Sequence, residues 1–270
     1  MFNLPTEPTK AQRINPKKLV IYSHPKVGKT SATSMLKNAL NIDFEEGAQA
    51  VDGMSINIKE ILRANPTENI LTVLTNLKNQ LEDYYAKNKK WQYDYLIIDT
   101  TTSLEDYAKQ YATVLYKQTP MGKTYTGNNV INDLPQGGGY GYLRDAFEKL
   151  LALMDGKCNI CTILIAHSKD ASINKMGKDL TAKDVALTGK LKMIVLSDAD
   201  GIGFLYRNPA NVNQTMISFV SHEQDLATGA RQEHISGREF VLLELQNPDF
   251  VKTGEKRIFT NEWNKIFIDK

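Results

Sequence analysis

Short apolar runs alternate with amphipathic stretches through the first two thirds of the chain. The runs lie at residues 19–22, 39–44, 95–98 and 158–166. Helices are predicted over residues 31–40, 67–84, 103–115 and 142–154, and in the last three of these the large apolar side chains recur every three or four residues. Strands that alternate with helices favour right-handed crossovers and a mostly parallel sheet covered on both faces. The pattern therefore predicts an α/β fold.

Two of these helices have a polar residue suited to cap their first turn. Thr67 follows Pro66 ahead of one helix, and Ser103 precedes the apolar face of another. Two long segments lack periodicity, namely residues 117–141, which contain three consecutive glycines, and the polar residues 168–186. Both are expected to be loops, and loops of this length are usually functional or disordered.

The two ends of the chain differ from its middle. Residues 1–18 contain three prolines among polar residues and predict a flexible arm. After Gly201, short strand-like pieces at residues 204–207, 216–220, 240–245 and 258–267 favour an antiparallel extension of the sheet. We therefore expect an α/β core over residues 19–240 and a β extension over residues 241–270.

Composition and charge narrow the class of protein. The 270 residues include 33 basic and 31 acidic side chains, for a formal net charge of +2, which excludes nucleic-acid binding through bulk charge. The longest apolar run is far short of the roughly 18 residues that span a bilayer, and no cationic stretch with an apolar core begins the chain. We therefore expect a cytoplasmic protein without a membrane partner.

Two cysteines, Cys158 and Cys161, form a C-x-x-C pair beside an apolar run. A structural zinc site needs four ligands, and the sequence offers no second pair. These cysteines are therefore expected to be core residues rather than a zinc or redox site.

Residues 23–30, SHPKVGKT, match the P-loop pattern G-x-x-x-x-G-K-[ST] except that Ser23 replaces the first glycine. In this motif, backbone N–H groups at a helix N-terminus hold phosphate oxygens, the lysine reaches the β and γ phosphates, and the last residue ligates Mg²⁺. A predicted strand precedes the motif and a predicted helix follows it, as this chemistry requires. The residues expected to bind ATP are Ser23, His24, Pro25, Lys26, Val27, Gly28, Lys29, Thr30 and Ser31.

A second G-K-T tripeptide, Gly122-Lys123-Thr124, is an internal control for this motif. It has no strand before it and no apolar helix after it, so it is expected to be a chance match within a loop.

Polar residues that fit phosphate chemistry stand where three predicted strands end. Asp99 is expected to hold the Mg²⁺ shell through water, as a Walker B carboxylate does. Glu45 or Glu46 is placed to orient the water that attacks the γ-phosphate, although with Asp43 they also form an acidic run typical of a surface loop. His167 is placed to donate a hydrogen bond to the γ-phosphate, with an ordinary strand-end histidine as the alternative.

Five segments, in this order, resemble the RecA-like core, and most closely the phage-encoded RecA-like recombination ATPases of the Sak type. They are LVIYSHPKVGKT, NIDFEEGA, YLIIDTTTSLEDYA, TILIAHSKD and LTGKLKMIVLSDADGIGFLYRN, and the resemblance spans about residues 17–240. It implies an ATPase that binds single-stranded DNA in recombination or repair, assembles side by side into a ring or filament with ATP between subunits, and promotes annealing or strand exchange.

The same resemblance implies roles for individual residues. It favours Glu45 as the catalytic carboxylate, with Glu46 as the alternative, and His167 is similar in place to the family's γ-phosphate sensor. Lys190 and Lys192 resemble basic residues that reach a neighbouring subunit's ATP. A single-strand binding protein is a candidate loading partner in the cytoplasm of a bacterial host.

The two long polar segments fit contact with single-stranded DNA. Residues 168–192 contain six lysines and three aspartates, an excess of three positive charges (6 − 3), and residues 117–141 add lysines and tyrosines. Cations for phosphates and aromatic faces for bases are typical of single-strand binding, with a solvated surface as the alternative. The DNA-binding candidates are Lys123, Tyr125, Lys169, Lys175 and Lys178.

Two other functions share the predicted ATP site. One is a DnaB-like or packaging-type DNA motor, which would move in one direction along DNA. The other is an annealing module that ATP switches without useful hydrolysis.

Overall fold

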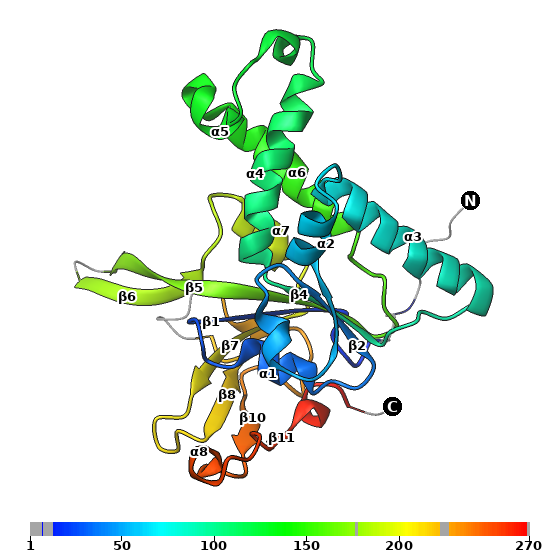
Figure 1. The fold of residues 1–270 in the computed structure, drawn as a ribbon. Helices are drawn as coiled ribbons and strands as arrows, with labels where there is room; N and C mark the ends of the chain where they lie inside the picture. The colour runs from blue at the N-terminus through cyan, green and yellow to red at the C-terminus, as the bar shows by residue number, and fades with distance from the viewer. Residues whose placement is uncertain (1–6, 8–12, 176–177, 222–226, 269–270) are drawn as a thin grey trace.

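One mixed sheet organises the part of the chain that this computed structural model describes, which is residue 7 and residues 13–175, 178–221 and 227–268, without the side chains of residues 173–181. The strand order is β11-β10-β8-β7-β1-β5-β4-β2-β3 (Figure 1). All neighbours from β7 to β3 in this order are parallel. These strands are β1 (Lys18–Ser23), β2 (Ala39–Asp43), β3 (Met54–Asn57), β4 (Tyr95–Asp99), β5 (Cys161–Lys175) and β7 (Gly201–Arg207).

Successive residues of β1 point into two different cores, as the period of two in a strand requires. Val20 and Tyr22 belong to the core that four helices cover, while Leu19 and Ile21 belong to the core on the opposite face. The four helices are α3 (Ile70–Asn88), α4 (Thr101–Lys117), α6 (Gly139–Ala152) and α7 (Leu191–Ser197). The opposite face is covered by α1 (Lys29–Ser34) and C-terminal segments. The prediction of a mostly parallel sheet covered on both faces is confirmed.

The predicted helix boundaries need three corrections. The N-cap of α3 is Asn69, not Thr67, because the Asn69 side chain accepts the Thr72 N–H at 3.1 Å. The N-cap of α4 is Thr100, which accepts the Ser103 N–H, so Ser103 lies inside the helix. The helix predicted over residues 31–40 ends at Ser34, and β2 begins five residues later.

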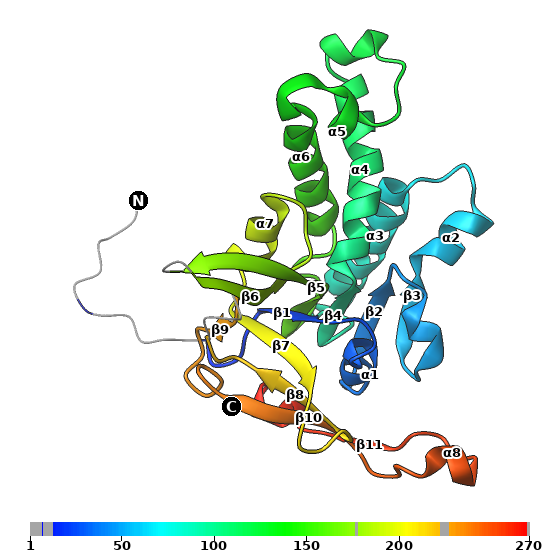
Figure 2. The same cartoon turned by 90° about the vertical axis from the view of Figure 1, so that its left-hand side faces the viewer.

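The segment predicted as a loop over residues 168–186 is instead a β-hairpin. The second half of β5 pairs with β6 (Lys178–Val185) in antiparallel register, from Ser168 opposite Val185 to Lys175 opposite Lys178. The hairpin extends away from the sheet (Figure 2). Apolar residues alternate in it only at Ala171 and Ile173 in one strand and at Leu180 and Ala182 in the other, among lysines and aspartates, which is too short a pattern to predict strands.

Residues 117–141 are also more ordered than a loop. They form η2 (Met121–Thr124), α5 (Val130–Asp133) and η3 (Pro135–Gly137), at the far end of a projection formed by α4 and α6 (Figures 1 and 2). Gly122 is buried there, and an added Cβ would lie only 1.9 Å from the Tyr116 carbonyl oxygen. The second G-K-T tripeptide is therefore a packed turn and not a phosphate loop.

The predicted antiparallel extension is confirmed after β7, whereas residues 204–207, predicted as its first piece, belong to β7 and lie parallel to β1. The strand predicted over residues 258–267 ends at Asn261. After β7 come β8 (Gln214–Ser218), β10 (Glu239–Leu245) and β11 (Phe259–Asn261), each antiparallel to its neighbour. The remaining elements are η1 (Gly47–Ala50), α2 (Ile58–Ala64), β9 (Gly229–Ala230), α8 (Phe250–Thr253) and η4 (Trp263–Lys265). The boundaries at residues 18 and 240 stay predictions. No helix within the described ranges has the length and apolar character needed to cross a membrane.

Candidate functional site

The P-loop connects the end of β1 to the start of α1. Gly28 has φ 108° and ψ 27°, a left-handed conformation that glycine adopts without steric cost. Ser23 is buried, and its Oγ donates to the His24 carbonyl oxygen at 2.8 Å. The serine in place of the first glycine is therefore accommodated at the end of β1.

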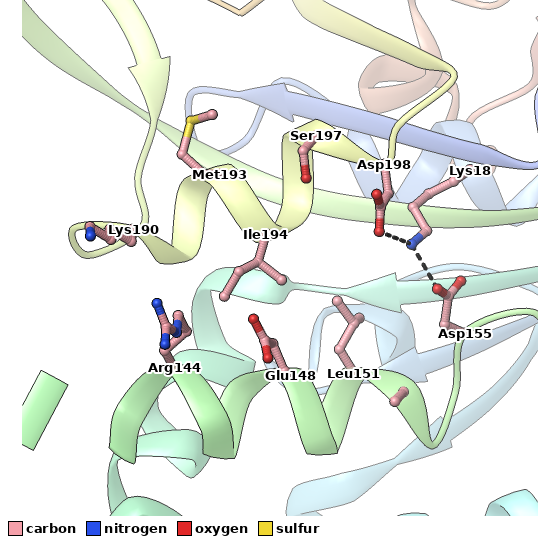
Figure 3. A pocket seen from close by; sticks show the side chains of 11 residues that line it. Lys18, Arg144, Glu148, Leu151, Asp155, Lys190, Met193, Ile194, Ser197 and Asp198 are labelled. Carbon is pink, nitrogen blue, oxygen red and sulfur yellow. Dashed lines mark ion pairs between the residues drawn. The ribbon is translucent and has the colours of Figure 1, made fainter. Parts of the chain in front are cut away.

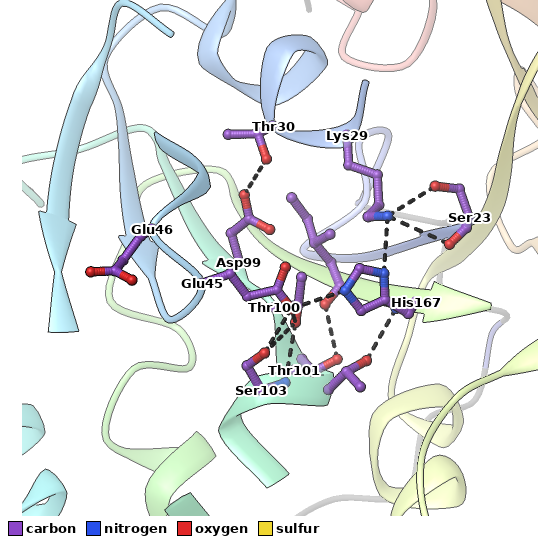
Figure 4. A network of polar contacts seen from close by, with 12 residues as sticks. Ser23, Lys29, Thr30, Glu45, Glu46, Asp99, Thr100, Thr101, Ser103 and His167 are labelled. Carbon is purple, nitrogen blue, oxygen red and sulfur yellow. Dashed lines mark hydrogen bonds and ion pairs between the residues drawn. The ribbon is translucent and has the colours of Figure 1, made fainter. Parts of the chain in front are cut away.

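Lys29 folds back across this loop. Its Nζ lies 3.1 Å from Ser23 Oγ, 3.2 Å from the His24 carbonyl oxygen and 3.4 Å from His167 Nδ1 (Figure 4). Burial lowers the pKa of Lys29, and the negative charges of Asp99 and Glu45 oppose that shift. A buried cation surrounded by oxygen acceptors is suited to bind phosphate oxygens in their place.

Thr30 and Asp99 form the part of the site that fits a hard cation. Thr30 Oγ1 donates to Asp99 Oδ2 at 2.7 Å, and Asp99 is 3% exposed. Burial raises the pKa of Asp99, the nearby carboxylates of Asp43 and Glu45 raise it further, and the Thr30 and Asn41 hydrogen bonds oppose the shift. Buried carboxylates this close together are electrostatically suited to a divalent cation.

A cluster of three or more His, Cys, Asp and Glu side chains placed to hold a metal does not occur within the described residues. Mg²⁺ usually binds one or two protein oxygens together with waters and substrate phosphates. Thr30 and Asp99 fit that role.

Glu45 is held as an anion by three hydrogen bonds to one oxygen. Oε1 accepts from Thr100 Oγ1 and Ser103 Oγ at 2.6 Å each, and lies 2.9 Å from His167 Nε2 (Figure 4). Burial raises its pKa, but the hydrogen bonds from His167, Ser103 and Thr100 outweigh burial and lower the pKa to about 2. Glu45 is therefore ionised at neutral pH and fixed in orientation.

His167 connects Lys29 to Glu45. If the Lys29 ammonium donates to Nδ1, then Nε2 carries the proton and donates to Glu45. This assignment satisfies both nitrogens of a neutral imidazole. His167 also stands opposite Ser23 in the register of β1 and β5, one residue before the hairpin pairing begins at Ser168.

Glu46 points away from this network (Figure 4). Its carboxylate lies 2.5 Å from Arg63 Nη1 and 4.0 Å from Lys59 Nζ, both on α2. The sequence left open which of the two glutamates, Glu45 or Glu46, orients the attacking water. The structure places Glu45, and not Glu46, beside His167 and the P-loop.

Asp43 shapes the turn that carries both glutamates. It is 1% exposed, its Oδ1 accepts the Glu45 and Glu46 N–H groups, and its Oδ2 accepts the Ala48 N–H, each at 2.8 Å. In the sequence, Asp43 appeared only as part of an acidic run. The missed signal was an aspartate two residues before a turn, where its side chain can bond nearby backbone N–H groups.

Arg207, at the end of β7, is a second residue that the sequence did not reveal. A methyl group in place of one Gly28 hydrogen would lie 3.9 Å from Arg207 Nη2, and Nη1 donates to Thr215 Oγ1 at 2.9 Å. Burial lowers its pKa, with a contribution from the charge of Arg257. Only the pairing of β7 with β1 brings this arginine to the P-loop.

We expect Arg207→Ala to weaken ATP binding about tenfold or more, since a hydrogen bond to a charged group contributes about 1.5–3 kcal/mol. Equilibrium titration with a fluorescent ATP analogue measures the change. Arg238→Ala, at an exposed position in the sequence between β9 and β10, is the matched control and should leave affinity within twofold. Equal affinities for the two variants would show that Arg207 does not contact the nucleotide.

Lys190 and Lys192 lie outside this network. Lys192 Nζ pairs with Asp184 Oδ2 at 2.8 Å. Lys190 lines a cleft of about 550 Å³ between α6 and α7, where Arg144 lies opposite it (Figure 3). Their expected action on a neighbouring subunit's ATP stays a prediction.

The DNA-binding candidates are dispersed. Lys169 is exposed and its Nζ donates to the Leu187 carbonyl oxygen at 3.3 Å, while Lys123 is exposed on η2. The Tyr125 hydroxyl donates to Asp133, and its ring packs edge-on against Tyr116, so it is not a free stacking surface. The Lys175 and Lys178 side chains lie outside the described part.

Of the two cysteines, Cys161 is a core residue, whereas Cys158 is partly buried and packs against the core. Both are free thiols, and Cys161 is fully buried. Burial raises the pKa of each thiol. A raised pKa lowers the thiolate fraction and so opposes metal binding and redox reactivity.

One family model and two solved structures are similar to this chain. A family model described as "AAA domain" matches residues 15–231. The RadB recombinase crystal structure aligns with a TM-score of 0.42 and 12% identity over 84% of this chain and 86% of that one. An ATPase from the type III secretion system of pathogenic bacteria aligns with a TM-score of 0.42 and 13% identity, over 76% and 61%. No curated protein matches the sequence.

Proposed function

The chain belongs to the AAA domain family and is a P-loop ATPase, and from this premise we propose that it couples ATP hydrolysis to the binding of single-stranded DNA during recombination. The observation that carries the proposal is the position of His167. Its ring lies between Lys29 and Glu45, and the next residue begins the β5–β6 hairpin. One side chain therefore adjoins both the phosphate site and the element that carries DNA-binding candidates.

In this mechanism the P-loop N–H groups and Lys29 bind the β and γ phosphates. Thr30 and Asp99 would hold Mg²⁺, which when bound neutralises charge on the phosphate oxygens. Glu45 orients the attacking water. Its low pKa makes it a weak proton acceptor, which suits phosphoryl transfer, where positioning contributes more than early proton removal.

Binding of a γ-phosphate changes what Lys29 contacts. Lys29 Nζ now lies 3.4 Å from His167 Nδ1, and a phosphate oxygen that attracts the ammonium competes with this nitrogen. His167 then loses the Lys29 ammonium as the donor to Nδ1, so its ring is free to turn its Nε2–H from Glu45 to the γ-phosphate, and the base of the hairpin moves with it. ATP therefore controls how the hairpin, with Lys169, is presented to DNA.

The larger assembly is part of the same proposal. We expect RecA-like subunits, phage-encoded and acting in a bacterial cytoplasm, to associate into a ring or filament, with Lys190 or Lys192 near a neighbour's ATP. Exposed Lys190 has no ion-pair partner in the described chain, which leaves it available for such a contact. Annealing or strand exchange, with a single-strand binding protein as a loading partner, would be the activity of that assembly.

The test is ATP turnover with and without a single-stranded 30-mer. We expect single-stranded DNA to raise turnover at least threefold, a duplex of equal length to raise it less, and His167→Gln to remove the stimulation because the link to the hairpin is lost. Turnover unaffected by single-stranded DNA in the parent would refute the coupling. A retained stimulation in His167→Gln would refute the route through His167.

A further inference from the structure

A second cleft lies at the edge of the sheet where the parallel strands begin, away from the P-loop at their carboxyl ends. It has a volume of about 600 Å³, within the range of roughly 300–1,000 Å³ typical of ligand sites. Lys17 and Lys18 line it at the start of β1, and Ile160 lines it just before β5. Since β1 has six residues, this edge is roughly 17–20 Å from the P-loop.

The cleft has more cations than its carboxylates neutralise. Five cations line it (Arg13, Lys17, Lys18, Lys89 and Lys90) against three aspartates (Asp155, Asp198 and Asp200), an excess of two positive charges (5 − 3). All three aspartates are already engaged: Lys18 pairs with Asp155 and Asp198 (Figure 3), and Arg13 pairs with Asp200. Lys17, Lys89 and Lys90 are exposed, and none has an ion-pair partner within the described ranges.

An aromatic pair lies in the same cleft. The rings of Tyr85, on α3, and Trp91, which follows that helix, have centroids 4.6 Å apart at an interplanar angle of 32°. Tyr85 is 42% exposed, and Lys157 Nζ lies 5.7 Å from the centre of the Trp91 ring. The cleft therefore offers an exposed aromatic side chain next to unpaired ammonium groups.

Lysines at the end of a helix have a simpler explanation, because cations there complement the helix dipole. That explanation covers Lys89 and Lys90, which follow α3, but not Lys17, which comes from the segment before β1. It also does not account for an exposed tyrosine in the same cleft. Ammonium groups that bind phosphates, together with an aromatic face for a base, match single-stranded nucleic acid.

We propose that this cleft, lined by Lys17, Lys89, Lys90, Tyr85 and Trp91, is a second binding site for single-stranded DNA, separate from the hairpin and independent of ATP. A strand bound there would have phosphates on the lysines and a base on the exposed face of Tyr85. The proposal goes beyond the ATP-coupled function and does not depend on it.

Tryptophan fluorescence reports on this cleft directly. The chain has two tryptophans, and Trp263 is 4% exposed with its indole N–H bonded to the Ala32 carbonyl oxygen, so an added ligand in the cleft acts on Trp91. We expect a dT20 oligonucleotide to quench the emission without ATP, in the parent and in Lys29→Ala alike. Trp91→Phe should abolish the quenching. An unchanged parent spectrum at saturating dT20 would overturn the proposal.

Charge reversal tests the phosphate contacts. Lys89→Glu/Lys90→Glu should weaken dT20 quenching at least tenfold at low salt, whereas Lys252→Glu/Lys265→Glu, with the same change in net charge, should alter it less than twofold. An equal loss in both variants would indicate bulk charge alone and overturn the site. Lys17→Glu, in the segment before β1, is the second variant and should weaken binding even if the double variant folds poorly.

Stacking is tested with a ligand that lacks bases. Loss of one stacked base weakens binding at least about fivefold, so Tyr85→Ser should weaken dT20 and leave an abasic 20-mer unaffected, with ATP turnover in the absence of DNA unchanged. The abasic 20-mer should also bind the parent at least fivefold more weakly than dT20. Equal binding of the two oligomers, or equally tight binding of dTMP, would overturn a single-strand site in favour of a polyanion or mononucleotide pocket.

Discussion

Glu45→Gln should lower ATP turnover by roughly 10²–10⁴-fold, the usual contribution of a positioned acid or base, while ATP affinity stays within about threefold of the parent. The substitution keeps the shape of the side chain but removes the negative charge that His167, Thr100 and Ser103 stabilise by donating hydrogen bonds. A neutral amide orients water poorly and presents a mixed donor and acceptor to these three groups. Steady-state phosphate release and a fluorescent-nucleotide titration measure the two quantities separately.

The neighbouring residue provides the control. Glu46→Gln makes the same chemical change one position along, where the carboxylate pairs with Arg63 outside the site. Because an exposed ion pair contributes little to stability, we expect turnover within about twofold of the parent. A large loss in Glu46→Gln with a small one in Glu45→Gln would reverse the assignment of the two glutamates. Full activity in both variants would instead favour an ATP switch without useful hydrolysis.

Four strands of the parallel sheet were predictable because they are buried on both faces, namely β1, β2, β4 and the first half of β5. These four strands appear in the sequence as short, mostly apolar runs, and polar residues of the site follow directly where the runs end, as Asp99 and Glu45 do. The P-loop was predictable for a different reason, since its function depends on backbone geometry that requires glycine and lysine at fixed spacing. Both signals are local in sequence.

The parts of the fold and of the site that the sequence did not predict depend on contacts between residues far apart in the chain. The β5–β6 hairpin is mostly polar, so apolar residues alternate over only two positions in each of its strands, and β3 has an exposed methionine and serine at its start. Arg207 reaches the P-loop only because β7 lies beside β1, and the Tyr85 cleft forms only because the start of β1 meets the end of α3. No local sequence pattern predicts these contacts, because they depend on the order of the strands in the sheet.

Lys29→Met should remove ATP binding and turnover, with a fall in turnover of at least about 10²–10³-fold, the loss expected when one group that stabilises developing charge is removed. Lys29 is 7% exposed, and its ammonium contacts Ser23, the His24 carbonyl and His167. Methionine fills the same space without the charge. ATP at about 100 times its dissociation constant stabilises a protein by about 2.7 kcal/mol, so the parent should melt at a higher temperature with ATP and Lys29→Met should not.

The chain supplies its own control in the second G-K-T tripeptide. Lys123→Met makes the identical substitution in the identical tripeptide, but Lys123 is exposed on η2, where Gly122 is packed against Tyr116 and no strand leads into the turn. If the strand and helix around the motif confer phosphate binding, Lys123→Met keeps the parent's ATP affinity, turnover and ATP-dependent melting shift. If the tripeptide itself were sufficient, both variants would lose affinity to a similar degree. The difference between the two variants therefore measures the contribution of the surrounding fold to the function of the motif.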